Sequence, residues 1–390
     1  MNRRFYVASE QEIREGRVAD VYFERALRAL PPEQADQEVT AEIRTRRLRD
    51  GGEWGILAGV EEAMGLLEGL NVQVSALPEG SVFYGREPVM TIQGPYRAFG
   101  LHETALLGLL CQASGIATRA ARCRVAAGDR LLLSFGVRRM HPALSPMIDR
   151  ACYIGGCDSI SSMLAAELIG ISPSGTMPHA LVLLLGDTLE AAWAYHAGVE
   201  QGIPRVVLID TFQDEKFEVL RVAEAMRTTL AGVRFDTPGS RRGDLREIMA
   251  ETRWELCIRG YDWVKLYASG GINAESIREL NDVCDGYGVG TALSNAPTVD
   301  FALDIVEIGG QPMSKRGKRS GAKLVVRCPK CGARAIVYRP HGPGICPTCE
   351  VPRESLHRPF IHRGDIIAEL PSAAAIRQHT LSELADLPSD

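Results

Sequence analysis

The stretch "KLYASGGINAESIRELNDVCDGYGVGT", Lys265 to Thr291, contains two glycine-rich loops, and each directly follows a short apolar run. In parallel α/β proteins such a loop leads from a strand into a helix, and glycine supplies backbone conformations that other residues avoid. Both loops can be plain strand-to-helix turns. Alternatively, their backbone N–H groups can surround one phosphate dianion, as they do after the last two strands of many α/β barrels. The pair of loops favours a phosphate site.

Similar apolar runs with polar ends recur upstream, in "RLLLSFG", "CDSISS", "PRVVLIDTF" and "GVRFDTPG". The successive steps from Asp210 to Asp236, from Asp236 to Ser269 and from Ser269 to Thr291 are 26, 33 and 22 residues. Each step is the size of one strand-loop-helix unit. We therefore predict an α/β fold with an irregular or incomplete α/β barrel over residues 111–311. Barrels of this kind place their active sites at the carboxyl ends of the strands.

The remaining chain indicates two further parts. Residues 1–110 show helical patterns over 9–30 and around 53–69, followed by alternating apolar residues over 72–96 that predict short antiparallel strands. We expect an N-terminal α/β domain there, packed on the barrel. Residues 312–390 form a C-terminal segment that begins with "PMSKRGKRSGAK", which we interpret as an exposed linker.

The composition is that of an ordinary globular protein. The formal net charge is -5, with 45% hydrophobic and 24% charged residues, so no overall positive field favours nucleic acid or anionic lipid. The sequence lacks a membrane-spanning apolar run, and its N-terminus lacks the apolar core of a signal peptide. We expect a cytoplasmic protein. Only six of the 44 basic residues are lysine, which predicts anion sites built from arginine.

Four cysteines near the C-terminus have the spacing of a metal site: Cys328, Cys331, Cys346 and Cys349. Two Cys-x2-Cys knuckles separated by fourteen residues indicate tetrahedral zinc in a structural role, because four thiolates leave no open position. His341 could replace one thiolate, or it could be a loop histidine. The other six cysteines resemble reduced core residues.

Acidic and basic side chains cluster at the ends of the predicted strands. These residues are Asp210 and Asp236, Arg138 and Arg139, and the arginines 234, 241 and 242. Arginine binds phosphate through two parallel hydrogen bonds, and carboxylates orient hydroxyls or metal-bound water. The group therefore suits a Mg-bound polyphosphate beside a sugar hydroxyl. Surface or interface ion pairs are the alternative.

His179 lies in "SPSGTMPHALVLLLGD", after a Gly-Thr turn and a proline, where an apolar helix begins. An imidazole at this position can act as a nucleophile or contact phosphate. It can also be a capping or core residue.

Taken together, "ADVYF", "SFGVRRMHP", "SGTMPHAL", "LIDTF", "FDTPGSRRGD", "SGGI" and "GVGT", followed by the four cysteines, resemble a nicotinate phosphoribosyltransferase. The resemblance is to the short form with a C-terminal zinc knuckle, and it runs from about residue 9 to 350. It implies transfer of phosphoribose from phosphoribosyl pyrophosphate to nicotinate, with Mg and coupled ATP hydrolysis, in NAD biosynthesis. It also implies a homodimer or an assembly of dimers.

The resemblance assigns roles to residues already singled out. Phe135 and Tyr22 would stack on the pyridine ring, with Tyr22 supplied by the partner subunit, and His179 would be phosphorylated by ATP. The implied catalytic carboxylates are Asp210 and Asp236. Further implied substrate ligands are Arg138, Arg139, Thr176 and Arg234. The 5'-phosphate would be held by Ser269, Gly270, Gly271, Gly290 and Thr291.

Two other classes of protein remain open. A quinolinate phosphoribosyltransferase has the same fold but decarboxylates a diacid, and it normally lacks the zinc module and the histidine of "GTMPH". A zinc-ribbon protein that binds nucleic acid needs a basic stripe beside the cysteines. "SKRGKRSGAK" is the candidate for that stripe.

Overall fold

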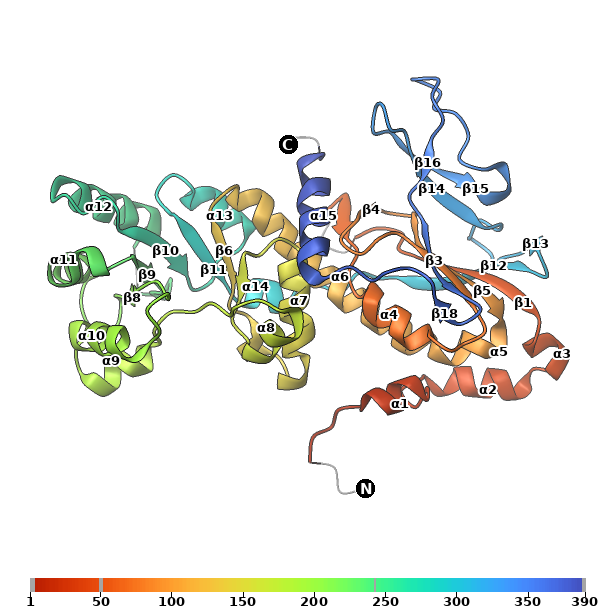
Figure 1. Cartoon of the computed structure of the whole chain (residues 1–390), viewed down its shortest axis with the longest axis horizontal. Helices are drawn as coiled ribbons and strands as arrows, with labels where there is room; N and C mark the ends of the chain where they lie inside the picture. The colour runs from red at the N-terminus through yellow and green to blue at the C-terminus, as the bar shows by residue number, and fades with distance from the viewer. Residues whose placement is uncertain (1–3, 49–51, 242, 388–390) are drawn as a thin grey trace. The chain divides into compact units, whose positions relative to one another are not determined.

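The computed structural model describes residues 4–48, 52–241 and 243–387. The chain forms two compact units, the first from Met1–Thr118 together with Pro297–Asp390 and the second from Arg119–Ala296. This division differs from the three consecutive segments expected, because both ends of the chain build one unit. Strand β12 (Ala302–Ile308) pairs with β1 (Glu38–Arg44), and β17 (Arg358–His362) pairs with β3 (Gln73–Ala76) (Figure 1).

The first unit contains an antiparallel seven-stranded sheet in the order β13-β12-β1-β5-β3-β17-β18. Its other strands are β5 (Pro88–Pro95), β13 (Gln311–Pro312) and β18 (Asp365–Ile366). Smaller sheets join β2 (Trp54–Ile56) to β4 (Val82–Tyr84), and β14 (Lys323–Arg327) to β15 (Arg334–Tyr338) and β16 (Glu354–Ser355). The antiparallel strands expected over 72–96 are confirmed as β3, β4 and β5.

Short helices accompany these sheets. They are α1 (Glu10–Arg14), α2 (Val21–Ala29), α3 (Pro32–Ala35), α4 (Val60–Leu67), α5 (Tyr96–Phe99) and α15 (Ala373–Ala385). The helical pattern over 9–30 is interrupted at Gly16, which has a φ of 71°, so it forms α1 and α2. The helix expected around 53–69 is partly wrong, because 54–56 pair with β4 and α4 starts only after Gly59.

The segment after β12 is not a simple exposed linker. Lys315 and Lys318 contact Asp304 of β12 at 2.9 and 2.6 Å, and Lys323 is buried beside Glu42 of β1 at 3.1 Å. These pairs attach the lysine-rich stretch to the sheet. The sequence pattern showed its charges but not the two buried carboxylates that compensate them.

The second unit contains six parallel strands in the order β7-β6-β11-β10-β9-β8. They are β6 (Leu131–Ser134), β7 (Ser159–Ile160), β8 (Val206–Leu208), β9 (Gly232–Phe235), β10 (Lys265–Ser269) and β11 (Gly286–Val289). The last strand, β11, pairs with the first, β6, as in a closed barrel, whereas β7 and β8 are free edges of this sheet. The expected incomplete barrel is therefore confirmed as a half-barrel.

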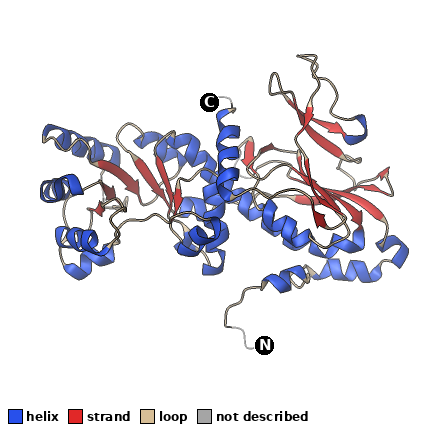
Figure 2. Cartoon of the chain, in the orientation of Figure 1, coloured by secondary structure: helices blue, strands red, loops and turns tan. Residues whose placement is uncertain are grey.

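Helices connect these strands and lie around them (Figures 1 and 2). They are α7 (Ser145–Ile154), α8 (Met163–Ile169), α9 (His179–Leu185), α10 (Thr188–Gly198), α11 (Glu215–Met226), α12 (Leu245–Ile258), α13 (Ala274–Leu280) and α14 (Thr291–Ser294). The long helix α6 (Glu103–Ala127) precedes them. Asp187, Asp214, Asp244 and Asn273 cap four of these helices by accepting backbone N–H groups. Across the described ranges, no helix is both long and apolar enough to span a bilayer.

Candidate active site

All six strands of the half-barrel are parallel, so their carboxyl ends lie at one edge of the sheet. The residues that directly follow these strands include Phe135 after β6, Asp236 after β9 and Gly270 after β10. Asp210 follows β8 by two residues. The sequence-predicted carboxylates and glycine loops therefore share this edge.

Arg234, Ser269 and Asp236 form a connected polar network between β9 and β10. Arg234 Nη1 donates to Ser269 Oγ at 2.8 Å and lies 3.2 Å from Asp236 Oδ2. Ser269 Oγ lies 2.9 Å from Asp236 Oδ1 and donates to it. These contacts fix the Asp236 carboxylate at the sheet edge and leave its charge balanced by one guanidinium.

The same arginine anchors the loop that precedes α9. Arg234 Nε donates to Thr176 Oγ1 at 2.8 Å, and its Nη2 donates to the Met177 carbonyl at 3.2 Å. A guanidinium has five N–H donors, and these contacts together with Ser269 and Asp236 use four of them. Arg234 therefore acts mainly as a link between strands and loop, with one N–H left for a ligand.

His179 begins helix α9 and faces both carboxylates. Its Nε2 lies 3.6 Å from Asp236 Oδ2 and 3.9 Å from Asp210 Oδ2, and its side chain is 41% exposed. Its Nδ1 lies 3.1 Å from Thr211 Oγ1. Thr211 was not singled out from the sequence, although it stands beside Asp210 in "LIDTF". The imidazole is thus held on one side by a hydroxyl and on the other by two acids.

Asp210 is the most buried member of this cluster. Its side chain is 2% exposed, and within the described residues its buried Oδ1 has no hydrogen-bond partner. Burial raises the pKa of Asp210, and the nearby His179 and Arg234 oppose that rise. A buried carboxylate oxygen without a donor is costly. It is therefore suited to accept a metal ion, metal-bound water or a sugar hydroxyl.

The two glycine loops, 269–271 and 288–291, follow adjacent strands. Ser269 of β10 pairs with Gly288 of β11, so Gly270 and Gly290 emerge beside each other. Gly270 has a φ of 79°, and a Cβ there would lie 2.8 Å from Asp236 Oδ1. Only glycine suits this position, because any side chain would be strained and would displace the carboxylate.

Phe135 lies over the same strands. A Cβ on Gly288 would lie only 2.4 Å from the Phe135 ring, so glycine at 288 makes room for the aromatic ring. Arg138 and Arg139 follow in a short 3-10 helix, Val137–Arg139, and both are exposed. They are therefore accessible to an anionic ligand.

The other predicted residues are Tyr22, Arg241 and Arg242. Tyr22 belongs to the first unit, on α2, where its side chain is 59% exposed and its ring packs 4.3 Å from that of Phe23. Arg241 is exposed after β9, and Arg242 lies outside the described residues. Arg241 donates its backbone N–H to the Pro238 carbonyl at 2.8 Å, and within the described residues no contact ties its side chain to the carboxylates.

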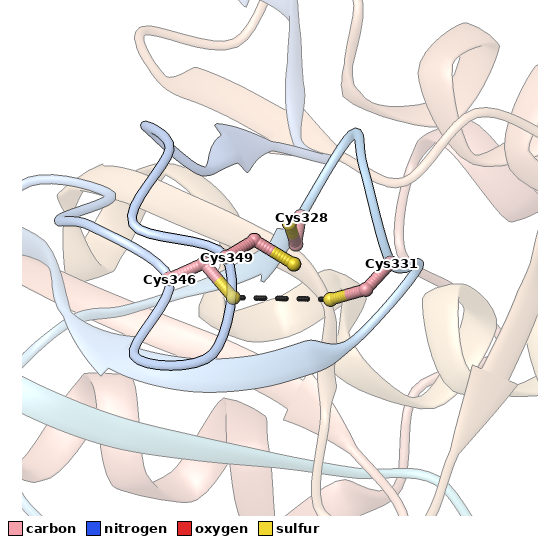
Figure 3. Close-up of side chains that lie close together, drawn as sticks. All are labelled: Cys328, Cys331, Cys346 and Cys349. Atoms are coloured by element: carbon pink, nitrogen blue, oxygen red, sulfur yellow. Dashed lines mark hydrogen bonds between the residues drawn. The ribbon is translucent and has the colours of Figure 1, made fainter.

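The four C-terminal cysteines come together in the first unit (Figure 3). Their sulfur atoms all lie within 4.8 Å of one another, and Cys331 Sγ is 3.8 Å from Cys346 Sγ. Tetrahedral zinc with Zn–S bonds of about 2.3 Å requires sulfur atoms about 3.8 Å apart. The donor set and its spacing fit zinc, and His341 is not part of the cluster.

The two knuckles have matching backbone turns. Gly332 N donates to the Cys328 carbonyl, and Glu350 N donates to the Cys346 carbonyl, at 3.0 and 2.9 Å. Gly332 and Glu350 both have positive φ angles, 72° and 56°. The backbone N–H of Cys331 lowers the pKa of the Cys328 thiol to about 7, whereas hydrogen bonding with Cys331 raises the pKa of the Cys349 thiol to about 12.

Sequence reasoning missed a cationic cavity in the first unit. It has a volume of about 540 Å³, and its lining includes Arg44, Arg46, Arg86, Lys318 and Arg319. Arg44 is only 10% exposed, and within the described chain its buried Nη2 has no hydrogen-bond partner. These cations come from the end of β1 and the residues after it, from the β4–β5 turn and from the segment after β12. No local sequence pattern shows that they line one cavity.

The chain matches known protein families and curated relatives. The family model "Quinolinate phosphoribosyl transferase, N-terminal domain" matches residues 20–114, and its C-terminal counterpart matches 116–304. Nicotinate phosphoribosyltransferase pncB1 of Mycobacterium tuberculosis is 29% identical over 93% of this chain and 88% of its own length. Nicotinate phosphoribosyltransferase 2 of Arabidopsis thaliana is 29% identical over 70% of this chain and 61% of its own length.

Solved structures agree with this assignment. A nicotinate-nucleotide pyrophosphorylase from Pyrococcus furiosus has a TM-score of 0.95 and 48% identity, with 98% of both chains covered. Human nicotinic acid phosphoribosyltransferase shares the fold, with a TM-score of 0.74 and 22% identity over 95% of this chain and 94% of its own. The chain therefore belongs to the quinolinate phosphoribosyl transferase family and is a phosphoribosyltransferase.

Proposed function

We propose that this enzyme is a nicotinate phosphoribosyltransferase, which forms nicotinate mononucleotide and pyrophosphate from nicotinate and phosphoribosyl pyrophosphate in NAD biosynthesis. The observation that carries the proposal is His179 at the edge of the half-barrel, 3.6 and 3.9 Å from the carboxylates of Asp236 and Asp210. The curated relatives from Mycobacterium tuberculosis and Arabidopsis thaliana bear the same name. That name supports the choice of acceptor.

The chemistry requires positioning more than proton transfer. The pyridine nitrogen attacks the anomeric carbon while pyrophosphate leaves, and positive charge develops on the ribose ring. Asp210 and Asp236 stabilise that charge or hold the ribose hydroxyls, since both carboxylates lie at the same sheet edge. Arg234 keeps Asp236 and the Thr176 loop in place.

Magnesium fits the same carboxylates. The unpartnered Oδ1 of Asp210 and the exposed side of Asp236 offer oxygen ligands of the kind that Mg²⁺ prefers. When bound, the ion would neutralise charge on the leaving pyrophosphate. The phosphate of the ribose would be held by Ser269, Gly270 and Gly271 on one loop and Gly290 and Thr291 on the next.

The acceptor would bind beside β6. Phe135 would stack on the pyridine ring, and the exposed Arg138 and Arg139 would meet its carboxylate. Tyr22 would cover the other side of the ring from the partner subunit of a homodimer or an assembly of dimers. Arg234 would contribute through its one remaining N–H.

His179 would couple ATP to the reaction as a phosphohistidine. Its side chain is 41% exposed, so a nucleotide can approach, and the two acids can orient the imidazole through Nε2. In that arrangement the γ-phosphoryl group moves from ATP to an imidazole nitrogen. Hydrolysis of the phosphohistidine would then drive product formation.

Zinc would have a structural role at Cys328, Cys331, Cys346 and Cys349. The nucleic-acid alternative loses support, because the lysines of "SKRGKRSGAK" contact Asp304 and Glu42 of the same unit. Those lysines do not form an uncompensated basic stripe beside the cysteines.

Quinolinate phosphoribosyltransferase remains the second candidate. The names of the matching family domains favour it. The two reactions differ in one product, because quinolinate must lose carbon dioxide to give the same nucleotide.

A steady-state assay of nicotinate mononucleotide tests the first proposal. The wild type is given nicotinate, phosphoribosyl pyrophosphate and Mg, with and without ATP, and is compared with His179→Ala. We expect ATP to raise product in the wild type and to have no effect in the variant. Product that is insensitive to ATP in both would keep the transferase and remove the phosphohistidine. Absence of product from nicotinate in all conditions would overturn the proposal.

A further inference from the structure

A buried carboxylate behind the candidate site has no part in the chemistry described above. Asp149 lies on α7 and is 0% exposed. Its Oδ1 accepts a hydrogen bond from Ser134 Oγ at 2.8 Å, and its Oδ2 accepts the backbone N–H of Ser162 at 2.9 Å. A third donor is the backbone N–H of Ser161. Burying an acid is costly, so this one has a specific structural task.

Ser134, the first hydrogen-bond partner of Asp149, directly precedes the aromatic residue Phe135. Ser134 is the last residue of β6, and Phe135 follows it directly. The carbonyl of Val289 in β11 accepts the Phe135 backbone N–H at 2.8 Å, and the ring lies over Gly288. The bond between Asp149 and Ser134 therefore holds the point from which the Phe135 side chain projects.

The other partners, Ser161 and Ser162, follow strand β7, and β7 contacts the loop that precedes His179. Ser161 and Ser162 follow β7, which has only two residues and pairs with β6 through Ser159 and Ile160. The Ile160 carbonyl accepts the backbone N–H of Ser174 at 2.8 Å, and Ser159 Oγ donates to the Ser172 carbonyl at 3.1 Å. So short a strand anchors the loop weakly by itself.

We propose that Asp149 is a positioning residue for the acceptor site: it joins the ends of β6 and β7, and so sets Phe135 against the 172–179 loop. It does not touch the substrate. The proposal rests on the proposed function in one respect, namely that Phe135 stacks on the pyridine acceptor. Its geometric part stands on the hydrogen bonds that Asp149 accepts from Ser134 Oγ and from the Ser162 backbone N–H.

The test compares Asp149→Asn with Asp158→Asn. Asp158 precedes β7, accepts the Leu132 backbone N–H at 2.8 Å and lies 3.4 Å from Arg124 Nη2, so it is an acid at the opposite end of the same two strands. We expect Asp149→Asn to raise KM for nicotinate roughly tenfold, since small displacements of a binding group have effects of this size. KM for phosphoribosyl pyrophosphate should stay within about twofold. Asp158→Asn should leave both KM values unchanged. If Asp149→Asn fails to fold, Ser134→Ala, which removes the hydrogen bond to Asp149 Oδ1, takes its place with the same expectation.

Hydrogen exchange separates this inference from the proposed function. In the ligand-free protein, Asp149→Asn should speed exchange in segments 134–136 and 172–178, whereas Asp158→Asn should not. If the wild type uses quinolinate instead of nicotinate, the KM for quinolinate is measured in its place. Unchanged acceptor KM together with unchanged exchange would overturn the inference, as would an equal rise in both KM values.

Discussion

The buried carboxylate of Asp210 is expected to lower the stability of the fold while serving the reaction. Burial raises its pKa above the ordinary value of 3.8, so the folded protein holds this proton more tightly than the unfolded chain does. The protonated carboxyl of Asp210 contributes stability at low pH. This contribution begins to be lost when the pH rises above the pKa of Asp210 in the unfolded chain, and it is lost completely above its pKa in the folded protein. Above the folded pKa the ligand-free enzyme therefore carries a buried charge that destabilises it.

Replacing this acid should have opposite effects on stability and activity. We expect Asp210→Asn, without ligands, to melt at a higher temperature than the wild type at pH 8 and to show a smaller gain at pH 4.5. Its kcat should fall by roughly 100-fold or more, because a charge-stabilising group is removed. Thermal melts at both pH values and a rate assay check this. A lower melting temperature at pH 8 would contradict the account of Asp210.

At the scale of single elements, the loop after β10 depends on glycine for two separate reasons. Gly270 has a φ of 79°, and it also lies against Asp236, where a Cβ would come within 2.8 Å of Oδ1. Gly170, which ends α8, has a φ of 72° and nothing within 4 Å. The two positions share backbone strain but differ in their neighbours.

Substitution by alanine should distinguish the effect of backbone strain from the effect of the contact with Asp236. We expect Gly270→Ala and Gly170→Ala each to lose roughly 1 to 2 kcal/mol of unfolding free energy, because both force a side chain into a left-handed conformation. Only Gly270→Ala should raise KM for phosphoribosyl pyrophosphate, since it displaces Asp236. Chemical denaturation and steady-state kinetics measure the two effects. Equal kinetics in the two variants would rule out a role for the Gly270 contact.

The elements also show what sequence can predict locally. Apolar runs ending in Asp210, Asp236 or the glycines of 270–271 indicated parallel strands, because both the strand and its polar end are short-range features. The run "CDSISS" indicated β7, but it did not show that the strand has only two residues, that it pairs with β6 or that Asp149 binds the residues after it. The contact between His179 and Thr211 is similarly invisible, because 32 residues separate them.

At the scale of the whole molecule, the cysteine cluster should stabilise the first unit through its metal. We expect about one zinc per chain, as one tetrahedral four-thiolate site requires. Cys346→Ser should lose the zinc and lower the melting temperature. The matched control is Cys257→Ser, an exposed cysteine on α12 outside the cluster. Elemental analysis and thermal melts test this, and a metal-free wild type of full stability would contradict it.

The cationic cavity of the first unit should bind a polyphosphate. Among the described residues that line it there is no carboxylate, and arginine favours phosphate oxygens. We expect Arg46→Ala to weaken pyrophosphate binding, measured by titration calorimetry, roughly tenfold, with a smaller effect at high salt. Arg377→Ala on α15, away from the cavity lining, serves as the control. Equal affinity in the two variants would exclude the cavity as an anion site.

Pairing between strands that are far apart in the sequence could not be predicted from the sequence. The sequence indicated an incomplete barrel and a four-cysteine module, and both features are present. It did not indicate that β12 pairs with β1 or that Arg44 and Lys318 line one cavity. Strand register and the convergence of distant cations depend on tertiary packing, which no local spacing records.

The most direct test of the central claim offers the enzyme nicotinate and quinolinate together. Phosphoribosyl pyrophosphate, Mg and ATP are supplied, each acid carries a distinct isotope label, and both the labelled nucleotide and released carbon dioxide are measured. The proposed function predicts that nearly all nucleotide carries the nicotinate label and that no carbon dioxide forms. Nucleotide derived from quinolinate, with an equal amount of carbon dioxide, would contradict it.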